Sequence, residues 1–374
     1  MTDWDERVCA AWLAGPLLPP ETLLFLIRRY ASAREIYRAF VSGDRECRER
    51  INPTHTSALI RGSAPEAMER CRDLMESHGI RAMLYNDPDY PECLRRIPEP
   101  PGVLFYQGNP GCASLQRKIA IVGSRRASYR GREATEKVAL ELSRSGVCIV
   151  SGLAYGIDTA AHKGCLDGGS PTIAVLGCGL DRTYPVENTS LRQAILEAGG
   201  LVLSEFAPGE SPLGWHFPIR NRIISGLGNA LVVMEARQRS GSLSTVQWAL
   251  DQGRDVFAYP GDPALAEYNE GNHQLLRDGA SFFARSGHIL EDMNWLDNPA
   301  ETGQNTTSLP EEHFSPQERR ILEALSPGAM GMDELCARTG IQPAELMSAI
   351  TMLQMRRRVE ALPGKLYRCV SPDR

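Results

Sequence analysis

A short apolar run in this sequence ends at a glycine and is followed at once by two arginines. The segment is KIAIVGSRR, residues 118–126. Glycine lets a backbone come close to a ligand, and the planar guanidinium group pairs with phosphate oxygens. Gly123, Ser124 and Arg125 therefore have the chemistry to hold a phosphate group.

The same pattern recurs along the middle of the chain. A glycine, a serine or a glutamate follows most of six apolar runs, at 119–122, 147–150, 172–176, 201–203, 230–234 and 256–259. After the fourth run come Arg220 and Arg222, and after the fifth comes Ser240-Gly241-Ser242. Backbone N–H groups at helix starts bind anions, so these segments favour a phosphate, or several phosphates in a row.

The elements that must position these residues follow from the runs themselves. The runs are continuously apolar and rich in β-branched residues, and helical segments lie between them. Such runs indicate strands buried on both faces of a parallel sheet. We therefore predict an α/β fold with a doubly wound, Rossmann-like sheet, in which ligands bind at the carboxyl ends of the strands.

Several common catalytic and cofactor motifs are absent from the sequence. There is no G-x-x-x-x-G-K-[ST], no H-E-x-x-H, no G-x-S-x-G and no C-x-x-C, and GSRRAS stands where a G-x-G-x-x-G is expected. His162 is a possible base, but a packed, hydrogen-bonded histidine is the preferred interpretation. Asp158 is interpreted as a helix cap rather than a catalyst. We expect no catalytic residue, no metal and no cofactor.

The chain divides into four regions by pattern. We predict a helical domain of the SAM or helix-hairpin-helix kind at 1–85, in which the stretch 19–40 is helical and another helix ends near Gly79. A Rossmann-like domain with its entry segment is predicted at 86–296. A polar linker follows at 297–314, and a winged-helix domain at 315–374 begins with Ser315 as helix cap. The segment 85–109 is interpreted as a connection. This domain has three arginines, Arg356-Arg357-Arg358, and a hairpin tip at Pro363-Gly364. These residues are compatible with contacts to duplex DNA and with contacts to protein, so both partners remain open.

Bulk composition is that of an ordinary globular protein. The 374 residues are 42% hydrophobic and 23% charged, and the net charge is −5. A nucleic acid would therefore have to meet a local basic patch. The ten cysteines are scattered singly, which favours reduced core thiols. No membrane segment and no secretory signal is expected, so a cytoplasmic location is predicted.

Seven blocks in the middle of the chain resemble, in order, the DNA-processing protein A family, also called Smf. They are IAIVGSRRAS, SGLAYGIDTAAHKGCL, TIAVLGCGLDRTYPVEN, SEF, HFPIRNRIISGL, VVMEARQRSGSLSTVQWAL and GRDVFAYPGD. The upstream stretch DPDYPECLRRIPEPPGVLFYQGN is also similar to that family's entry to its Rossmann domain.

The resemblance implies a protein that binds single-stranded DNA without marked sequence preference. It further implies that the protein loads the RecA recombinase onto incoming strands in natural transformation and is not an enzyme. It also implies homodimers that form through the Rossmann domain, with Leu275-Leu276 as the expected contact. The residues it implies for the DNA pocket are Gly123, Ser124, Arg125, Phe217, Arg220, Asn221, Arg222, Ser240, Gly241 and Ser242.

The sequence also departs from the family pattern. Gly214 and Val186 stand where some relatives have lysine, and Tyr155 stands where many have a basic residue. Missing lysines imply DNA binding that is weaker or more sensitive to salt, or compensation by neighbouring basic residues: Arg126, Arg130, Arg132 and Lys163. Trp215 and Phe217 are equally compatible with base stacking and with core packing. Arg222 is compatible with DNA binding and with a structural role in holding its loop.

Two other functions remain open at this point. A Rossmann-like nucleotide phosphoribohydrolase would have a similar sheet, but such enzymes usually show P-G-G-x-G-T-x-x-E where this chain has ARQRSGSLSTVQWAL. That region lacks the tandem glycines and the glutamate, which favours binding over catalysis. A structural adaptor acting through its terminal domains is the third possibility.

Overall fold

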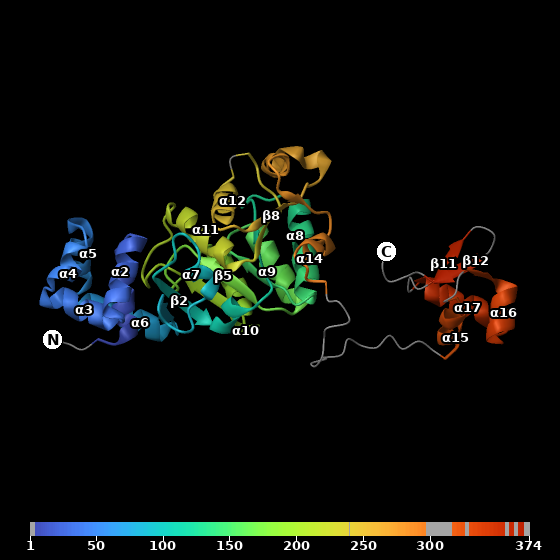
Figure 1. Ribbon diagram of the computed structural model, residues 1–374, viewed down its shortest axis with the longest axis horizontal. Coiled ribbons are helices and arrows are strands. Elements are labelled where there is room, and N and C mark those ends of the chain that lie inside the picture. The colour runs from blue at the N-terminus through green and yellow to red at the C-terminus, as the bar shows by residue number, and fades with distance from the viewer. Residues whose placement is uncertain are drawn as a thin grey trace. The chain divides into compact units, whose positions relative to one another are not determined.

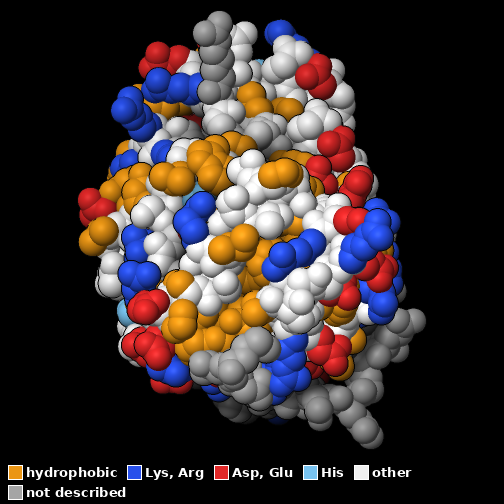
Figure 2. All heavy atoms as spheres, turned by 90° about the vertical axis from the view of Figure 1, so that its left-hand side faces the viewer, with side chains coloured by type: hydrophobic (Ala, Val, Ile, Leu, Met, Phe, Trp, Pro, Cys, Tyr) orange, Lys and Arg blue, Asp and Glu red, His pale blue; other side chains and the backbone are white. Residues whose placement is uncertain are grey.

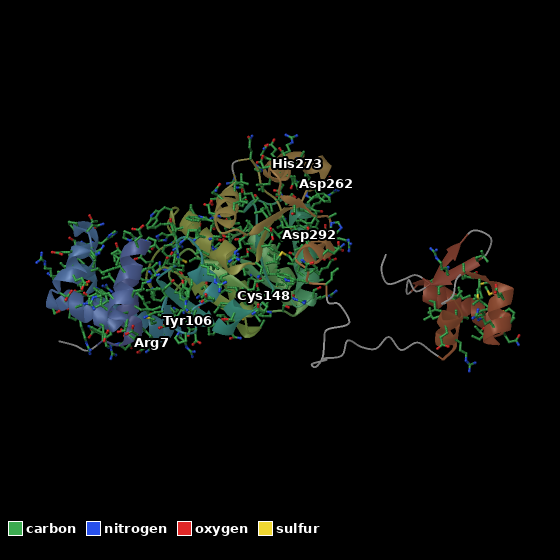
Figure 3. The ribbon with its side chains drawn as sticks, in the orientation of Figure 1. Arg7, Tyr106, Cys148, Asp262, His273 and Asp292 are labelled. Carbon is green, nitrogen blue, oxygen red and sulfur yellow. The ribbon has the colours of Figure 1, made fainter. Side chains whose placement is uncertain are left out.

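The computed structural model describes residues 4–238, 240–296, 316–325, 329–355, 359–362 and 366–369. The chain forms two compact units, Met1–Leu296 and Asp297–Arg374 (Figure 1). Among the described residues, no helix is long and apolar enough to cross a membrane. The described cysteines are free thiols, and most of them are buried, like Cys148 in the interior of the first unit (Figure 3).

The first unit begins with six helices, as predicted for this region. They are α1 (Glu6–Ala14), α2 (Pro20–Tyr30), α3 (Ala33–Ser42), α4 (Arg45–Glu49), α5 (Pro53–Gly62) and α6 (Pro65–Ser77). The apolar stretch 19–40 forms two helices, because Ala31 adopts a left-handed conformation and Ser32 then caps α3 through Glu35 N–H. In Figure 2, which faces these helices, Lys and Arg side chains alternate with Asp and Glu.

A nine-stranded sheet forms the centre of the first unit. Its order is β1-β2-β6-β5-β4-β3-β7-β8-β9. The six predicted runs are β3 (Lys118–Val122), β4 (Cys148–Ser151), β5 (Thr172–Leu176), β6 (Leu201–Ser204), β7 (Ala230–Val233) and β8 (Asp255–Ala258), all parallel. The short β9 (Ser281–Phe282) adds a parallel edge strand.

Two antiparallel strands extend the sheet beyond the prediction. β1 (Arg81–Leu84) pairs with β2 (Val103–Gly108), and β2 pairs with β6. The segment 85–109, interpreted from its prolines as a connection, therefore ends in a strand of the sheet, with the short α7 (Glu92–Arg95) before it. The domain boundary predicted after residue 85 falls between these two paired strands.

Alternating side chains of each central strand enter two different cores, one on each face of the sheet. Ile119 and Ile121 of β3 pack with α8 (Tyr129–Arg144), α9 (Ile157–Gly168) and α14 (Ser286–Asp292). Ala120 and Val122 pack with α11 (His216–Leu227) and α12 (Ser242–Asp251). Both faces are thus covered, which explains why the runs are continuously apolar.

The N-terminal helices share a core with one end of the sheet. Leu13 of α1 and Ile27 of α2 belong to the same buried cluster as Phe105 of β2 and Ala174 of β5. The cluster also includes Ile195 of α10 (Thr189–Glu197). This shared core explains why residues on both sides of the predicted boundary form one compact unit.

The second unit has the winged-helix order of elements. It contains α15 (Pro316–Leu325), β10 (Met330–Gly331), α16 (Met332–Thr339), α17 (Pro343–Met355), β11 (Val359–Leu362) and β12 (Leu366–Cys369), with sheet order β10-β12-β11. Gly340 ends α16 in the left-handed conformation. Ile321, Leu346 and Leu353 belong to a separate core. The predicted cap Ser315, the three arginines 356–358 and the hairpin tip 363–364 lie outside the described residues.

Candidate nucleic-acid interface

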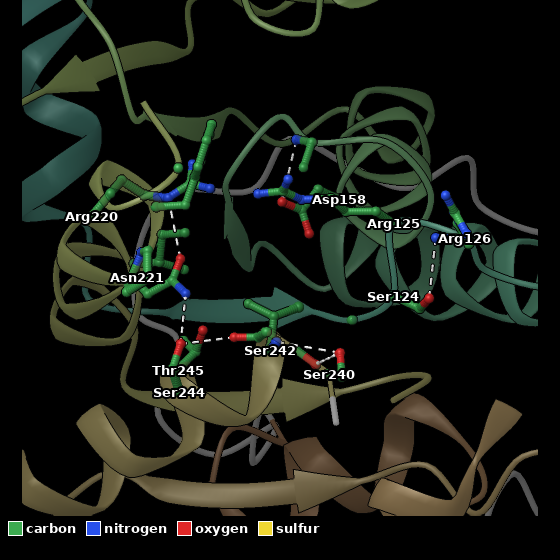
Figure 4. Close-up of a pocket in the computed structure, with 18 of the residues that line it drawn as sticks. Ser124, Arg125, Arg126, Asp158, Arg220, Asn221, Ser240, Ser242, Ser244 and Thr245 are labelled. Atoms are coloured by element: carbon green, nitrogen blue, oxygen red, sulfur yellow. Dashed lines mark hydrogen bonds between the residues drawn. The ribbon is translucent and has the colours of Figure 1, made fainter. Parts of the chain in front are cut away.

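A pocket opens where the strand order reverses. From β3 the chain proceeds to β4, β5 and β6 on one side, and it returns to the other side of β3 for β7 and β8. The loops that follow β3 and β7 therefore diverge and leave a crevice at the carboxyl ends of the strands. A pocket of about 720 Å³ lies there (Figure 4).

The loop after β3 forms one wall of the pocket through Gly123, Ser124, Arg125 and Arg126. The Ser124 N–H donates to the Glu235 carbonyl oxygen at 2.7 Å, which ties this loop to the end of β7. A Cβ on Gly123 would lie 2.5 Å from Ile157 Cγ1, so only glycine fits there. Ser124 is buried, whereas Arg125 and Arg126 are exposed. The wall is therefore rigid at its base and basic at its rim.

Helix α11 presents a second wall. Phe217, Arg220, Asn221 and Ile224 all line the pocket, because residues three, four and seven apart lie on one helix face. The Arg125 guanidinium lies 4.5 Å from the Phe217 ring centroid and that of Arg220 lies 5.8 Å from it. Phe217 thus forms a flat apolar surface contacted by two cations.

Arg220 is the buried cation at the pocket floor. It is 3% exposed and donates hydrogen bonds to the carbonyl oxygens of Gly152, at 2.8 Å, and of Val175. Burial lowers the pKa of Arg220 to about 10, an effect that the carboxylate of Asp158 opposes. The guanidinium therefore stays charged at neutral pH.

Asp158, on the first turn of α9, is the only carboxylate among the described residues that line this pocket. Its Oδ2 accepts a hydrogen bond from Ala154 N–H at 3.3 Å, so it holds the loop before α9. Burial raises the pKa of Asp158, and the charge of Arg220 counteracts that rise. Four arginines line the pocket against this one acid, the fourth being Arg237, so the site is locally basic in a chain of net charge −5.

The start of α12 closes the third side. Ser240 and Ser242 hydroxyl groups lie 2.7 Å apart, and Gly241 between them leaves open space beside the backbone. Ser242 is the first residue of α12, so the N–H groups of the first turn face this side. Asn221 Nδ2 donates to Ser244 Oγ at 3.1 Å, which joins α11 to α12. The arrangement suits an anion beside a helix start.

Arg222 is the one predicted site residue that the structure does not bring to the pocket. It is 3% exposed, and its Nη1 donates to Glu205 Oε2 at 2.8 Å. Its Nε donates to the Glu99 carbonyl oxygen at 2.9 Å. It thus fixes the segment after β6 and the entry to β2, which is a structural role.

Other sequence interpretations also have a structural outcome. His162 is fully buried and bonds Thr172 Oγ1 at 2.8 Å, so the packing interpretation is confirmed. Phe217 is half-buried against Tyr184 at 5.6 Å between ring centroids, whereas Trp215 is 52% exposed. Arg130 pairs with Asp262 outside this pocket, and Arg132 donates to the Ala127 carbonyl oxygen.

Sequence reasoning missed several residues that line the pocket. They are Tyr184, Pro212, Ile224, Arg237, Ser244 and Thr245. A signal existed for Ile224 and Thr245, because each lies one or two helical turns from a predicted residue on the same helix. Tyr184 had no such signal, since its position depends on how the loop after β5 crosses α11.

The site has the features of a binding surface for phosphates and flat rings. Arginine forks and a helix start supply donors, and Phe217 and Tyr184 supply apolar rings. The described residues contain no group of three His, Cys, Asp or Glu side chains able to hold a metal ion.

Comparisons with known proteins identify relatives over both units. The family model for DNA recombination-mediator protein A matches residues 81–294, and the one for the DprA winged helix domain matches residues 304–365. DNA processing protein DprA of Streptococcus pneumoniae is 46% identical over 209 residues, which are 56% of this chain and 73% of that protein. Protein Smf of Synechocystis is 36% identical over 313 residues, 75% of this chain and 78% of that one.

The solved structures that resemble the fold include two DNA processing proteins. The X-ray structure of the S. pneumoniae protein has a TM-score of 0.63 at 35% identity and covers 75% of this chain and 95% of its own. A structure of DNA processing protein A from Helicobacter pylori, reported for its unique single-stranded DNA binding mode, has a TM-score of 0.51 at 28% identity and covers 57% and 95%. These matches extend over most of the sheet and the pocket, and the chain belongs to the DNA recombination-mediator protein A family.

Proposed function

We infer that this chain binds single-stranded DNA in the pocket at the switch point of its sheet. The observation that carries the proposal is the meeting of Arg125, Arg220 and the start of α12 around the Phe217 ring. Single-strand binders combine a basic groove with rings on which bases of any sequence stack. The single-strand binding mode studied in the H. pylori relative supports the proposal.

In this proposal the residues have distinct roles. Gly123 and Ser124 keep the backbone close to a phosphate, and Arg125 contacts that phosphate from the rim. Arg220 and Asn221 hold the pocket floor and the α11–α12 junction, while Ser240, Gly241 and Ser242 bind a further phosphate at the helix start. Arg222 supports the site from outside the pocket. None of these roles requires a bond to be made or broken, so the proposed activity is binding and not catalysis.

Within the cell, the proposed role is that of a recombination mediator. The family resemblance and the family's description support the loading of RecA onto incoming single strands during natural transformation. A homodimer through the Rossmann domain is part of the proposal. Leu275 and Leu276 of α13 (Glu270–Arg277) are half-buried, which leaves apolar surface for a second copy. Light scattering should give a dimer mass for the native chain and a monomer mass for Leu276→Arg.

The DNA proposal is tested by fluorescence anisotropy of a labelled oligothymidine and a matched duplex across salt concentrations. Arg125, Arg126 and Arg237 are the exposed arginines that line the pocket. One phosphate contact from each gives a slope of log K against log salt of about −2 for single strands. Arg125→Glu should weaken single-strand binding strongly. Arg45→Glu, on exposed α4 away from the pocket, makes the same change in net charge and should leave binding intact. Equal losses in both variants would contradict a local site.

A further inference from the structure

Three exposed aromatic side chains, Tyr155, Tyr184 and Trp215, follow three neighbouring strands at the same edge of the sheet as the pocket. Their exposed fractions are 41%, 40% and 52%. Tyr155 follows β4, Tyr184 follows β5, and Trp215 ends the segment between β6 and α11. We call these three residues the aromatic patch. Exposed large apolar side chains that gather in one place mark binding surfaces.

The aromatic patch adjoins the pocket at Tyr184. Tyr184 lines the pocket, and its ring centroid lies 5.6 Å from that of Phe217. Ala154 and Gly214, the neighbours of Tyr155 and Trp215 in sequence, also line the pocket. Tyr184 therefore belongs to both the pocket and the patch, and Tyr155 and Trp215 each lie one residue from a position that lines the pocket.

The patch rings are held before any ligand arrives. The Tyr155 hydroxyl donates a hydrogen bond to the Glu187 carboxylate. Trp215 lies edge-on to His216 at 4.1 Å between centroids, and His216 in turn is buried and stacked on Phe206 at 3.9 Å. A ring that is already oriented loses little conformational entropy on binding.

Charge differs sharply between the pocket and the patch. Four arginines line the pocket, whereas Arg182 in the loop after β5 is paired with Asp181, and Glu187 accepts from Tyr155. Phosphates are therefore attracted to the pocket end, and the patch end offers mainly flat apolar surface. A ligand that fits both ends carries phosphates along one side and flat apolar rings along the other.

We propose that the aromatic patch is a stacking platform for the bases of the single strand whose phosphates lie in the pocket, so that the strand leaves the pocket across the carboxyl ends of β4, β5 and β6. This inference rests on the proposed function. A duplex does not fit the patch in this way, because its base faces are covered by their neighbours.

The test separates stacking from charge through salt dependence. A ring contact contributes affinity without releasing counterions, so its loss lowers K while the salt slope stays the same. We would compare the full chain with Tyr155→Ala, Trp215→Ala and the double variant. Tyr155→Phe and Trp215→Phe keep a ring, and Ile60→Ala removes an equally exposed apolar side chain from α5. Anisotropy would be measured with oligothymidines of about four and about twelve nucleotides.

The expected result is specific to the longer strand. The double variant should bind the longer oligothymidine at least about tenfold more weakly, with the slope unchanged. The shorter oligothymidine should bind all variants about equally, because the pocket alone accommodates it. The phenylalanine variants and Ile60→Ala should match the native chain.

Three results would overturn the inference, and they are distinguishable. If the native chain binds no oligothymidine, the proposed function and the platform fail together. If the native chain binds but the double variant binds the longer strand equally well and has an unchanged mass, only the platform fails. If the double variant keeps its DNA affinity but changes its mass in light scattering, the patch is a contact between copies of the chain.

Discussion

Arg220 and Arg222, two residues apart on α11, are both buried but have different partners. Arg220 faces the pocket and the ring of Phe217, whereas Arg222 faces the carboxylate of Glu205. The helical period explains the difference, because positions 217, 220, 221 and 224 lie on one face and position 222 on another. Applied to FPIRNRI, the same period would have separated the two arginines from the sequence alone.

The ion pair of Arg222 with Glu205 gives a prediction about stability. Arg222→Ala leaves the Glu205 carboxylate, 13% exposed, without its partner. Loss of one member of a buried pair costs about 3–5 kcal/mol. Urea unfolding should show a loss of that size in the free energy of unfolding. Arg45→Ala breaks an exposed pair on α4 and should change little; equal effects of the two variants would contradict the structural role of Arg222.

His162 gives a prediction about pH. Burial lowers the pKa of His162 to about 3. The Thr172 hydroxyl donates its proton to the Ile149 carbonyl oxygen, so it accepts a hydrogen bond from the imidazole Nδ1–H of His162. The unfolded chain binds a proton at this histidine below about pH 6.5 and the folded chain does not. Stability should therefore fall on acidification from about pH 6.5 toward 3, by up to about 1.4 kcal/mol per pH unit.

The contribution of His162 is measured as a difference between variants. Unfolding free energies of His162→Gln and of the native chain should converge as the pH falls, because the variant lacks this titrating group. His78→Gln, at the exposed end of α6, serves as the control and should keep the native pH dependence. A constant gap between His162→Gln and the native chain over that range would contradict a neutral buried imidazole.

At the scale of elements, the parallel strands were predictable because burial on both faces leaves continuous apolar runs. The antiparallel β1 and β2 were not, because prolines dominate the segment between them and β2 pairs with β6, far away in sequence. The loops after β3 and β7 were identified from glycine, serine and arginine. Their meeting in one pocket depends on the strand order, which the sequence does not encode locally.

The loop after β3 depends on the absence of a side chain at residue 123. In Gly123→Ala the new Cβ would lie 2.5 Å from Ile157 Cγ1 and 2.9 Å from the Glu235 carbonyl oxygen. Overpacking of this kind costs about 1–3 kcal/mol, and it should also move Arg125 and weaken single-strand binding. Gly214→Ala, in open space at the same pocket, should affect neither stability nor binding. Thermal unfolding and anisotropy on both variants would show whether the close contact matters.

At the scale of the whole molecule, the two units have separate cores. The winged-helix residues Ile321, Leu346 and Leu353 form one cluster, and the residues around the sheet form others. The pocket lies entirely within the first unit. A chain ending at Leu296 should therefore fold and bind oligothymidine within about twofold of the full chain, as circular dichroism and anisotropy would report. A loss of binding in a folded truncated chain would place part of the interface in the second unit.

The net charge of −5 gives no sign of a nucleic-acid partner. The local excess of arginines in the pocket, where the strand order reverses, does indicate one. The measurement that tests this account most directly is the affinity for labelled oligothymidine across salt, for the native chain, Arg125→Glu and Arg45→Glu. The account predicts tighter binding of single strands than of duplex, with a slope of log K against log salt of about −2, and a strong loss of single-strand binding in Arg125→Glu but not in Arg45→Glu. Equal binding of duplex and single strand, or undiminished binding by Arg125→Glu, would contradict it.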